Sequence, residues 1–395
     1  MNKETKTSSL ASDHIIILGC GLSGMLTALA FAHQGLKVKI IESKSTRDVK
    51  FLDDNRTTAF TVASQEFMSK INIWPSLQEI AGKISDIYVV DDKSPNDIHF
   101  SSHQVNNDVM GYIVKNSKFK KILLSKVIDN NLITLMDNCT YRKFESFPDY
   151  FIVYLEDNKK LQCQLLIICE GYNSRVRVAY FGEYIQKSYE QKALTFNVTH
   201  ELSHNETAIE HFTDTGPFAI LPLRDAYMSS VVWTLTTEKA NILQKLPILE
   251  FQYLVQQNFG TFLGNIKIET KVTAHQLRAY LTQNYFHQRI VLVADSAHII
   301  HPLAGQGLNM GIKDIDTLVA LVENIGINSK MLNEYQQQRK SDNLHMYLIT
   351  DTLNRIFNNR SFLMNIVRKT GFFFIEKLLP IKNRLIKYAM GERRI

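Results

Sequence analysis

The chain is poor in cysteine and has no apolar segment long enough to cross a membrane. Its four cysteines among 395 residues show neither the CxxC spacing of a metal site nor the pattern of a secreted disulfide framework. No apolar run approaches the roughly 18 residues of a transmembrane helix. The first thirteen residues contain Glu4 and Asp13, no arginine and no apolar core, unlike a secretory or mitochondrial leader. We therefore expect a cytoplasmic protein without a metal site.

Positive charge is scarce in most of the chain and concentrated at its C-terminal end. The net charge is +6, but the segment from Leu353 onward carries ten Lys or Arg against Glu376 and Glu392. That segment has a net charge of +8, which leaves −2 for residues 1–352. A body without a basic stripe argues against a nucleic-acid partner. The length and the hydrophobic content of 45% suit a globular protein of two packed domains.

The N-terminal region has the pattern of a βαβ unit. His14–Leu18 is a short apolar run that predicts a buried parallel strand, and Met25–His33 has the composition of a packed helix. Gly35 follows the helix in the position that commonly ends one. Val38–Ile41 is the second predicted strand.

A glycine-rich turn joins this first strand to the helix. Gly19, Gly21 and Gly24 form the pattern G-x-G-x-x-G, in which the glycines permit a tight turn, close approach of a pyrophosphate and close packing of helix on strand. The helix N-terminus then favours the phosphate charge. Glu42 ends the second strand, where its carboxylate can bind an adenosine ribose or simply be solvated. The turn in this context predicts a dinucleotide site, for NAD or FAD.

The rest of the chain alternates between helical and strand patterns, which predicts an α/β fold. A stretch from Lys192 to Leu235 has the alternation of an antiparallel sheet, and the tail from about Met331 reads as helical. No linker separates these regions, so we expect interleaved domains. The further predicted helices are Phe119–Ile128 and Leu308–Asn324, and the predicted strands are Leu165–Cys169, Ala193–Val198, Ser229–Thr234 and Ile290–Ala294.

A second motif follows the predicted strand at residue 290. Asp295 is an acceptor at the carboxyl end of that strand, where ligands of parallel sheets bind. Gly305 and Gly307 free the backbone to point N–H groups outward at a helix start, an arrangement that stabilises negative charge. A reduced flavin carries such charge in its N1–C2=O region.

The stretch from Val293 to Asn309 resembles the GD…H…P…GQG-N motif of the class A flavoprotein aromatic hydroxylases, and more narrowly of the ubiquinone-biosynthesis hydroxylases. Three other segments resemble motifs of the same family. They are Asp54–Phe60, the segment Ile168–Arg177 with Gly171-Tyr172-Asn173-Ser174, and Glu210–Leu223 with Gly216-Pro217 and Leu221-Pro222-Leu223. The resemblance extends along most of the chain.

The resemblance implies roles for particular residues. Gly19, Gly21, Gly24 and Glu42 would bind the ADP half of FAD, Arg56 would lie near the pyrophosphate, Glu170 would contact cofactor, and Asp295 would hold the ribitol. Pro302, Gly305, Gly307, Leu308 and Asn309 would line the isoalloxazine ring. Pro302 and His298 are the candidate catalytic residues, although His298 could equally have a packing role. Arg177 could form an ion pair, for example with Glu170, or contact the cofactor, and His204 and Glu210 could be structural or functional.

Two positions depart from the family pattern. Ala294 replaces the glycine before the aspartate, which would add a methyl group where backbone and ribitol are close. Glu170 replaces an aspartate and is one methylene longer.

The resemblance also implies a fold like that of p-hydroxybenzoate hydroxylase. A Rossmann-type FAD-binding domain would be interleaved with a mixed or antiparallel β-sheet substrate domain and followed by a helical segment. The expected FAD-binding parts are residues 1–84, 113–182 and 277–330, the substrate-domain parts are 85–112 and 183–276, and the helical region is 331–395.

The implied activity is hydroxylation of the ring of a polyprenylated phenol in ubiquinone biosynthesis. NAD(P)H would reduce FAD, and O₂ would form a flavin C4a-hydroperoxide that the phenol attacks; the cofactor carries the chemistry. The alternatives are a prenyl-reductase-like flavoenzyme and a catalytically silent flavin-binding accessory protein. A homo-oligomer or a biosynthetic complex is also expected as a partner.

The C-terminal segment suggests a contact with the inner face of a membrane. Apolar residues at Gly371–Ile375 precede a stretch in which Leu385 and Ile386 alternate with Lys382, Arg384 and Lys387. A basic amphipathic helix suits an anionic lipid surface. Packing of this helix on the FAD domain or on a second subunit is the alternative.

Overall fold

A mostly parallel sheet is built on the N-terminal βαβ unit, as predicted. The computed structural model describes residues 13–92, 97–301, 305–358 and 378–391. The strand order is β18-β19-β11-β1-β2-β8, with β19 through β8 parallel, and a hairpin of β9 and β10 extends β11. The strands are β1 (Asp13–Leu18), β2 (Val38–Ile41), β8 (Ile133–Met136), β9 (Tyr141–Ser146), β10 (Phe151–Leu155), β11 (Lys160–Ile168), β18 (Phe286–His287) and β19 (Ile290–Leu292).

The second sheet is the antiparallel one that the alternation predicts. Its order is β20-β17-β12-β15-β14-β13-β5-β6, with β16 paired to β12, and only the β13–β5 pair is parallel. Its strands are β5 (Asp86–Asp91), β6 (Ile98–Ser101), β12 (Tyr184–His200), β13 (Thr207–Thr213), β14 (Gly216–Pro222), β15 (Met228–Thr236), β16 (Ile266–Ile268), β17 (Thr273–Thr282) and β20 (His298–Ile299). Because β17 and β20 belong to it, this sheet extends past the expected boundary at residue 276.

A small antiparallel sheet lies between the two large ones in the chain order. It consists of β3 (Thr57–Thr61), β7 (Gly111–Lys115) and β4 (Gly82–Ile84). Residues of β3, and Gly111 at the start of β7, line the cavity of the candidate active site.

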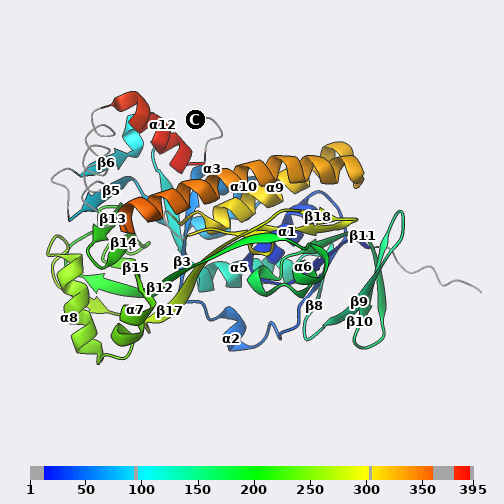
Figure 1. Cartoon of the computed structure of the whole chain (residues 1–395), viewed down its shortest axis with the longest axis horizontal. Helices are drawn as coiled ribbons and strands as arrows, with labels where there is room; N and C mark the ends of the chain where they lie inside the picture. The colour runs from blue at the N-terminus through cyan, green and yellow to red at the C-terminus, as the bar shows by residue number, and fades with distance from the viewer. Residues whose placement is uncertain (1–12, 93–96, 302–304, 359–377, 392–395) are drawn as a thin grey trace, which may run out of the picture.

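Helices pack against both large sheets (Figure 1). The long helices α9 and α10 lie side by side, and α1 packs on α9 and α5. The helices are α1 (Leu22–His33), α2 (Val49–Leu52), α3 (Val62–Lys70), α4 (Trp74–Gln78), α5 (Asn116–Ile128), α6 (Arg175–Tyr180), α7 (Thr237–Leu243), α8 (Ile248–Phe259), α9 (Gly307–Ile325), α10 (Ser329–Asn358) and α12 (Leu379–Ala389), with 3-10 turns η1 (Ser102–Val105), η2 (Gly171–Asn173) and η3 (Ala294–Ser296). The helical tail is thus confirmed in α10 and α12.

The hydrophobic core has three parts. The largest joins the parallel sheet to α1, α5 and α9, and a second joins the antiparallel sheet to α8 through residues such as Phe196, Trp233 and Phe251. A third cluster places Ile386 and Met390 at the C-terminal end against Ala208 of β13 and Met110. The C-terminal helix is therefore packed on the body of the molecule, in part against β13 of the antiparallel sheet.

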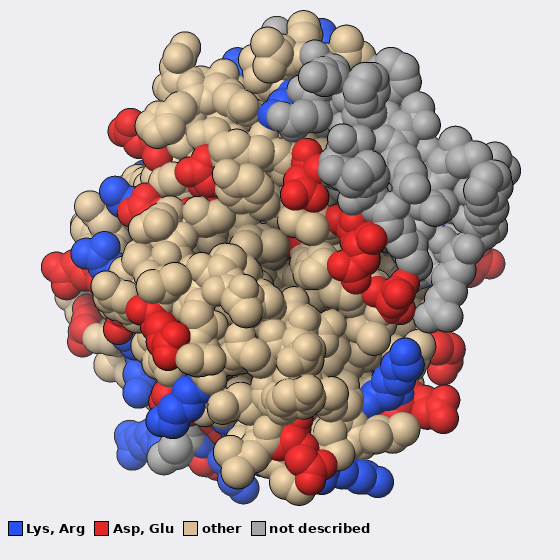
Figure 2. Space-filling model, turned by 90° about the vertical axis from the view of Figure 1, so that its left-hand side faces the viewer, with Lys and Arg blue, Asp and Glu red and all other residues tan. Residues whose placement is uncertain are grey.

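The surface of the described residues has two relevant features. None of their helices combines the length and the apolar character that crossing a bilayer requires. Figure 2 shows the face at the left of Figure 1, where Lys and Arg side chains are dispersed around an uncharged centre. The described residues of that face form no basic stripe of the kind that follows a nucleic-acid backbone.

Candidate active site

A cavity of about 2020 Å³ extends from the glycine loop to the antiparallel sheet. One end is lined by Gly19, Gly21 and Glu42, and the other by apolar side chains of β5, β6, β13 and β14. Single small-molecule sites commonly measure about 300–1,000 Å³, so this space can hold a large cofactor and a substrate together. Of the predicted site residues, Arg56, Glu170, Asp295, Gly305, Gly307 and Leu308 also line it.

The three glycines of the loop have different surroundings. Gly19 has φ +100°, and a Cβ there would lie 2.5 Å from the carbonyl oxygen of Cys169. A Cβ on Gly24 would lie 2.0 Å from the carbonyl oxygen of Gly19, so this residue lets α1 approach the loop. Gly21 has no atom within 4 Å of its Cβ position and faces the cavity. Two glycines therefore serve packing and one keeps space open.

The N-terminus of α1 is open to an anion. In the part of the chain that the structure describes no side chain caps this helix, and its first turn contains no acidic residue. Glu42 lies beside it, because its carboxylate accepts hydrogen bonds from the backbone N–H of Cys20 at 2.8 Å and of Lys44 at 2.9 Å. These bonds hold Glu42 beside the loop, and it is not a free strand end. The arrangement fits a dinucleotide whose pyrophosphate meets the helix and whose ribose meets the carboxylate.

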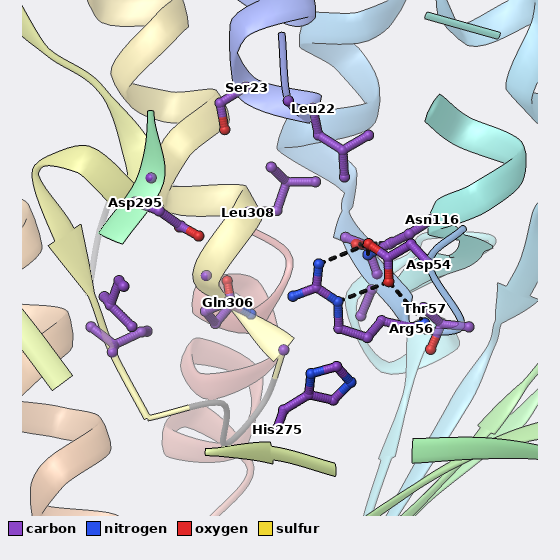
Figure 3. A pocket seen from close by; sticks show the side chains of 18 of the residues that line it. Leu22, Ser23, Asp54, Arg56, Thr57, Asn116, His275, Asp295, Gln306 and Leu308 are labelled. Carbon is purple, nitrogen blue, oxygen red and sulfur yellow. Dashed lines mark hydrogen bonds and ion pairs between the residues drawn. The ribbon is translucent and has the colours of Figure 1, made fainter. Parts of the chain in front are cut away.

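An ion pair forms one wall of the cavity, opposite Asp295 (Figure 3). Arg56 Nε donates to Asp54 Oδ1 at 2.9 Å and Arg56 Nη2 donates to Asp54 Oδ2 at 2.7 Å, and Asn116 Nδ2 donates to Asp54 Oδ2 at 3.4 Å. Burial raises the pKa of Asp54, but the contacts with Arg56 outweigh it and the net pKa is lowered. The carboxylate thus stays ionised and orients the guanidinium. Asp54 and Asn116 were not among the predicted site residues; the position of Asp54, two residues before Arg56, was the available signal.

Asp295 has no hydrogen-bond partner among the described residues, and it points toward the cavity in Figure 3. Burial raises its pKa, and the nearby His298 and Arg56 oppose that effect. The carboxyl group of Asp295 can therefore accept hydrogen bonds from hydroxyl groups in the cavity, such as those of a ribitol.

The residue before it, Ala294, does not face the cofactor space as expected. Its methyl group points to α9, where Gly311 has no side chain, and a Cβ on Gly311 would lie 2.6 Å from it. Ala294 has φ +54°, a conformation that favours glycine, and its N–H donates to Asp314 Oδ2 at 3.0 Å. The glycine-to-alanine departure is therefore accommodated by packing inside the protein.

The candidate catalytic residue His298 lies in a buried hydrogen-bond network. Its Nε2 is 2.5 Å from Asp314 Oδ2, and Arg339 Nε donates to Asp314 Oδ1 at 2.7 Å. Burial raises the pKa of Asp314, but His298 and Arg339 outweigh it and lower the net value. His298 is 2% exposed and does not line the cavity, so its position favours the packing role. The other candidate, Pro302, lies outside the described residues.

Glu170 and Arg177 each have partners other than one another. Glu170 lines the cavity and accepts hydrogen bonds from Tyr141 Oη at 3.0 Å and from Ser174 Oγ at 2.7 Å. Arg177 is buried with its guanidinium 4.2 Å from the ring centroid of Tyr280. The expected Arg177–Glu170 pair is therefore wrong for the described residues, because hydroxyl groups satisfy the carboxylate and aromatic rings surround the arginine.

The start of α9 forms a second open helix terminus. Among the described residues no side chain caps this helix, no acidic residue lies in its first turn, and Gly307 and Leu308 line the cavity. Asn309 turns away from the cavity. Its Nδ2 donates to the carbonyl oxygen of Ala59 at 2.8 Å and its Oδ1 accepts from Ser64 Oγ at 2.8 Å. Asn309 thus fixes the helix start to β3 and the start of α3.

Residues 13–343 match the family model described as FAD binding domain. The chain is 31% identical to ubiquinone hydroxylase UbiL of Rhodospirillum rubrum, over 96% of this chain and 90% of that protein. The chain belongs to the FAD-dependent hydroxylase family of ubiquinone biosynthesis. The hydroxylase is also 26% identical to 3-demethoxyubiquinol 3-hydroxylase of Escherichia coli, over 95% of this chain and 98% of that one.

The solved structures support the predicted fold. The hydroxylase superposes on p-nitrophenol 4-monooxygenase PnpA of Pseudomonas putida with a TM-score of 0.78, over 97% of this chain and all of that one, at 15% identity. The family resemblance and the fold expected from the sequence are confirmed. FAD is the cofactor, and the open glycine loop, the uncapped N-terminus of α1 and Glu42 are a site that fits it.

Proposed function

We propose that the hydroxylase inserts oxygen into the aromatic ring of a polyprenylated phenol, with NAD(P)H as electron donor and O₂ as oxidant, in ubiquinone biosynthesis. The observation that carries this proposal is the cavity. It joins a polar end at the glycine loop, Arg56 and Asp295 to an apolar end at β5, β6 and β13 without interruption. The similarity to ubiquinone hydroxylase UbiL and to 3-demethoxyubiquinol 3-hydroxylase supports the same substrate class.

We infer the following division of work among the residues. Gly21 and the N-terminus of α1 bind the pyrophosphate, Glu42 the adenosine ribose, and Asp295 the ribitol. Bound FAD supplies the oxygen-transfer chemistry. Gly307 and Leu308 present the N-terminus of α9 to the ring system, where N–H groups stabilise negative charge.

The substrate's apolar chain has a matching exit from the cavity. Ile349 and Leu353 of α10 and Leu385 of α12 line the cavity and are also 36%, 39% and 37% exposed. These three residues form an apolar rim at its mouth. A prenyl chain that extends through this rim would bury apolar surface, and each Å² removed from water would favour binding by about 25 cal/mol.

The test combines flavin reduction with product analysis. The enzyme is mixed anaerobically with NADH or NADPH, with and without 2-prenylphenol, and isotopically labelled O₂ is then admitted. A hydroxylase is expected to reduce its flavin faster with the phenol present and to place one labelled oxygen atom on the ring. Loss of a prenyl double bond without O₂ would instead identify a reductase, and absence of both reactions would identify a silent flavin-binding protein.

The apolar rim also supports a peripheral contact with a membrane. Leu378 and Leu379 at the start of α12 are exposed, as are Arg384 and Lys387 on the same helix. Lys382, expected on the basic face, is 2% exposed and is not part of it. The segment Gly371–Ile375 lies outside the described residues. We infer that the rim meets the lipid from which the substrate is drawn.

Sedimentation with vesicles tests this contact. The full-length enzyme is expected to bind vesicles that contain anionic lipid, and the double variant Leu378→Ser, Leu379→Ser is expected to bind several-fold less. Leu249→Ser, at an exposed leucine of α8 distant in sequence from the rim, is the matched control. Equal binding by the Leu378→Ser, Leu379→Ser variant and the wild type would contradict the contact.

A further inference from the structure

Glu210 occupies the centre of a cross-strand row that faces the cavity. In the strand register, Glu210 of β13 pairs with Val89 of β5 on one side and with Ala219 of β14 on the other. The row continues to Ile98 and, in the other direction, to Val232 and Thr195. All six residues line the cavity. Since alternate residues of a strand share a face, Ala208 and Phe212 lie on the same side of β13 as Glu210 and also line the cavity.

The carboxyl group is the charged member of this row, and no described residue bonds to it. Thr195, the other polar member, already has its hydroxyl 2.8 Å from that of Thr273. Unpaired carboxyl groups in apolar surroundings are rare, because a lost hydrogen bond costs about 1–3 kcal/mol. A ligand that brings a hydroxyl group into the cavity would supply the missing partner.

None of the described charged side chains on β5, β6, β13 or α12 contributes to the pKa of Glu210. On β5 and β6 Asp86 pairs with His99, and His211 of β13 pairs with Asp92. Asp91 of β5 and Lys382, Arg384 and Lys387 of α12 are the remaining charged side chains on these elements. Burial by itself raises the pKa of Glu210 to about 7, with no charged group contributing. That value lies near neutral pH, where a carboxyl group can both accept and return a proton.

We propose that Glu210 is the acid–base residue that binds the hydroxyl group of the phenol substrate. Its carboxylate accepts the phenol O–H as a hydrogen bond and takes the proton as the ring attacks the oxygen donor. The phenol O–H bond breaks, the carboxyl O–H bond forms, and the electron pair left on the phenol oxygen enriches the ring. When the hydroxylated ring regains aromaticity, its carbon releases a proton to solvent and its oxygen takes the proton back from Glu210. O₂ is the oxidant, one of its oxygen atoms enters the ring, and the two electrons of NAD(P)H reduce the other to water, so the proposal rests on the proposed function.

The first test is ligand discrimination, which does not require turnover. Titration of the FAD-loaded enzyme with 2-prenylphenol and with its methyl ether, followed by the flavin absorbance, gives a dissociation constant for each. The wild type is expected to favour the phenol at least tenfold, and Glu210→Gln to lose most of that preference. Binding of the ether, which has no proton to donate, should change less than threefold. A ratio unchanged in Glu210→Gln would overturn the proposal.

The second test is the pH profile of hydroxylation. In the wild type kcat/KM is expected to rise with pH through about 7, and Glu210→Gln should lower kcat by about 10²-fold and remove that rise. Glu210→Asp should restore part of both. Glu238→Gln, an exposed glutamate of α7, is the matched control with an unchanged profile.

The two proposals fail in different ways. If the wild type hydroxylates the phenol and Glu210→Gln keeps its rate and pH profile, the role of Glu210 is overturned and the proposed function stands. If the FAD-loaded wild type neither distinguishes the phenol from its ether nor forms product, the proposed function is overturned, and the role of Glu210 with it.

Discussion

The methyl group of Ala294 packs against Gly311 and occupies the space that a side chain at position 311 would need. A Cβ on Gly311 would lie 2.6 Å from the Cβ of Ala294 and 3.4 Å from its Cα. Asp314, one turn further along α9, accepts the N–H of Ala294 and holds its backbone at φ +54°. The pair therefore joins the turn before Asp295 to the helix that begins at the cavity.

Gly311→Ala is expected to destabilise the protein by about 1–3 kcal/mol, because the added methyl group overlaps that of Ala294. Ala294→Gly alone should change stability by less than about 1 kcal/mol, since relief of the positive φ offsets the lost contact. The double variant should recover at least about 1 kcal/mol relative to the sum of the two single changes. Denaturant unfolding of the four proteins measures this coupling, and strict additivity would contradict the packing described.

Gly21→Ala and Gly24→Ala should separate cofactor binding from folding. A Cβ on Gly21 meets no protein atom, so the apo-protein should keep its stability while FAD binds at least tenfold more weakly. A Cβ on Gly24 would lie 2.0 Å from the carbonyl oxygen of Gly19, so this change should destabilise the apo-protein by about 1–3 kcal/mol. Thermal unfolding without FAD and fluorescence titration with FAD distinguish the two effects.

Arg56→Gln is expected to weaken FAD binding about tenfold, which corresponds to about 1.4 kcal/mol. The change removes the positive charge that Asp54 orients toward the cavity. Isothermal titration of the apo-protein with FAD at low and high salt measures the effect, and the difference from wild type should shrink at high salt. Arg142→Gln, at an exposed position of β9 outside the cavity lining, is the control.

Asp314→Asn should destabilise the protein by about 3 kcal/mol, because it removes the buried carboxylate that pairs with His298 and Arg339 and leaves Asp342 as the acidic partner of Arg339. The folded-state pKa of Asp314 lies below its ordinary value of 3.8, so its contribution is present above that pH and is lost as the pH falls. The variant should therefore lose less stability than the wild type on acidification. Urea unfolding at neutral and acidic pH measures both effects. The control Asp316→Asn, on the same helix, should have a free energy of unfolding within about 0.5 kcal/mol of the wild type.

Glu210→Gln should become more stable relative to wild type as the pH rises. The pKa of Glu210 is about 7 in the folded protein against an ordinary value of 4.5, so the folded state binds the extra proton. The wild type then loses stability as the pH rises from about 4.5 through about 7, and the loss levels off above 7, whereas glutamine does not titrate. Thermal unfolding of both proteins at pH 5 and pH 8 measures the difference. A stability difference that is the same at both pH values would show that the carboxyl group titrates normally.

Local sequence patterns were sufficient for the elements that carry the cofactor loop. The apolar runs at His14–Leu18 and Val38–Ile41 recur as β1 and β2, and α1 covers the predicted helix, because a buried parallel strand and a packed helix each have a local pattern. The glycine spacing and Glu42 could be read in the same way, since one βαβ unit positions all of them.

Only the tertiary structure decided what the remaining site residues contact. The sequence by itself predicted a dinucleotide site and an antiparallel second sheet from local patterns, and its resemblance to a flavoprotein family predicted FAD. It left Glu210 and His298 each open to a structural or functional reading, and it placed the methyl group of Ala294 beside the cofactor. Strand register then turned Glu210 toward the cavity, and α9 brought Asp314 to His298 and Gly311 to Ala294. These contacts join residues from different elements, and a pattern along one segment does not specify the packing between elements.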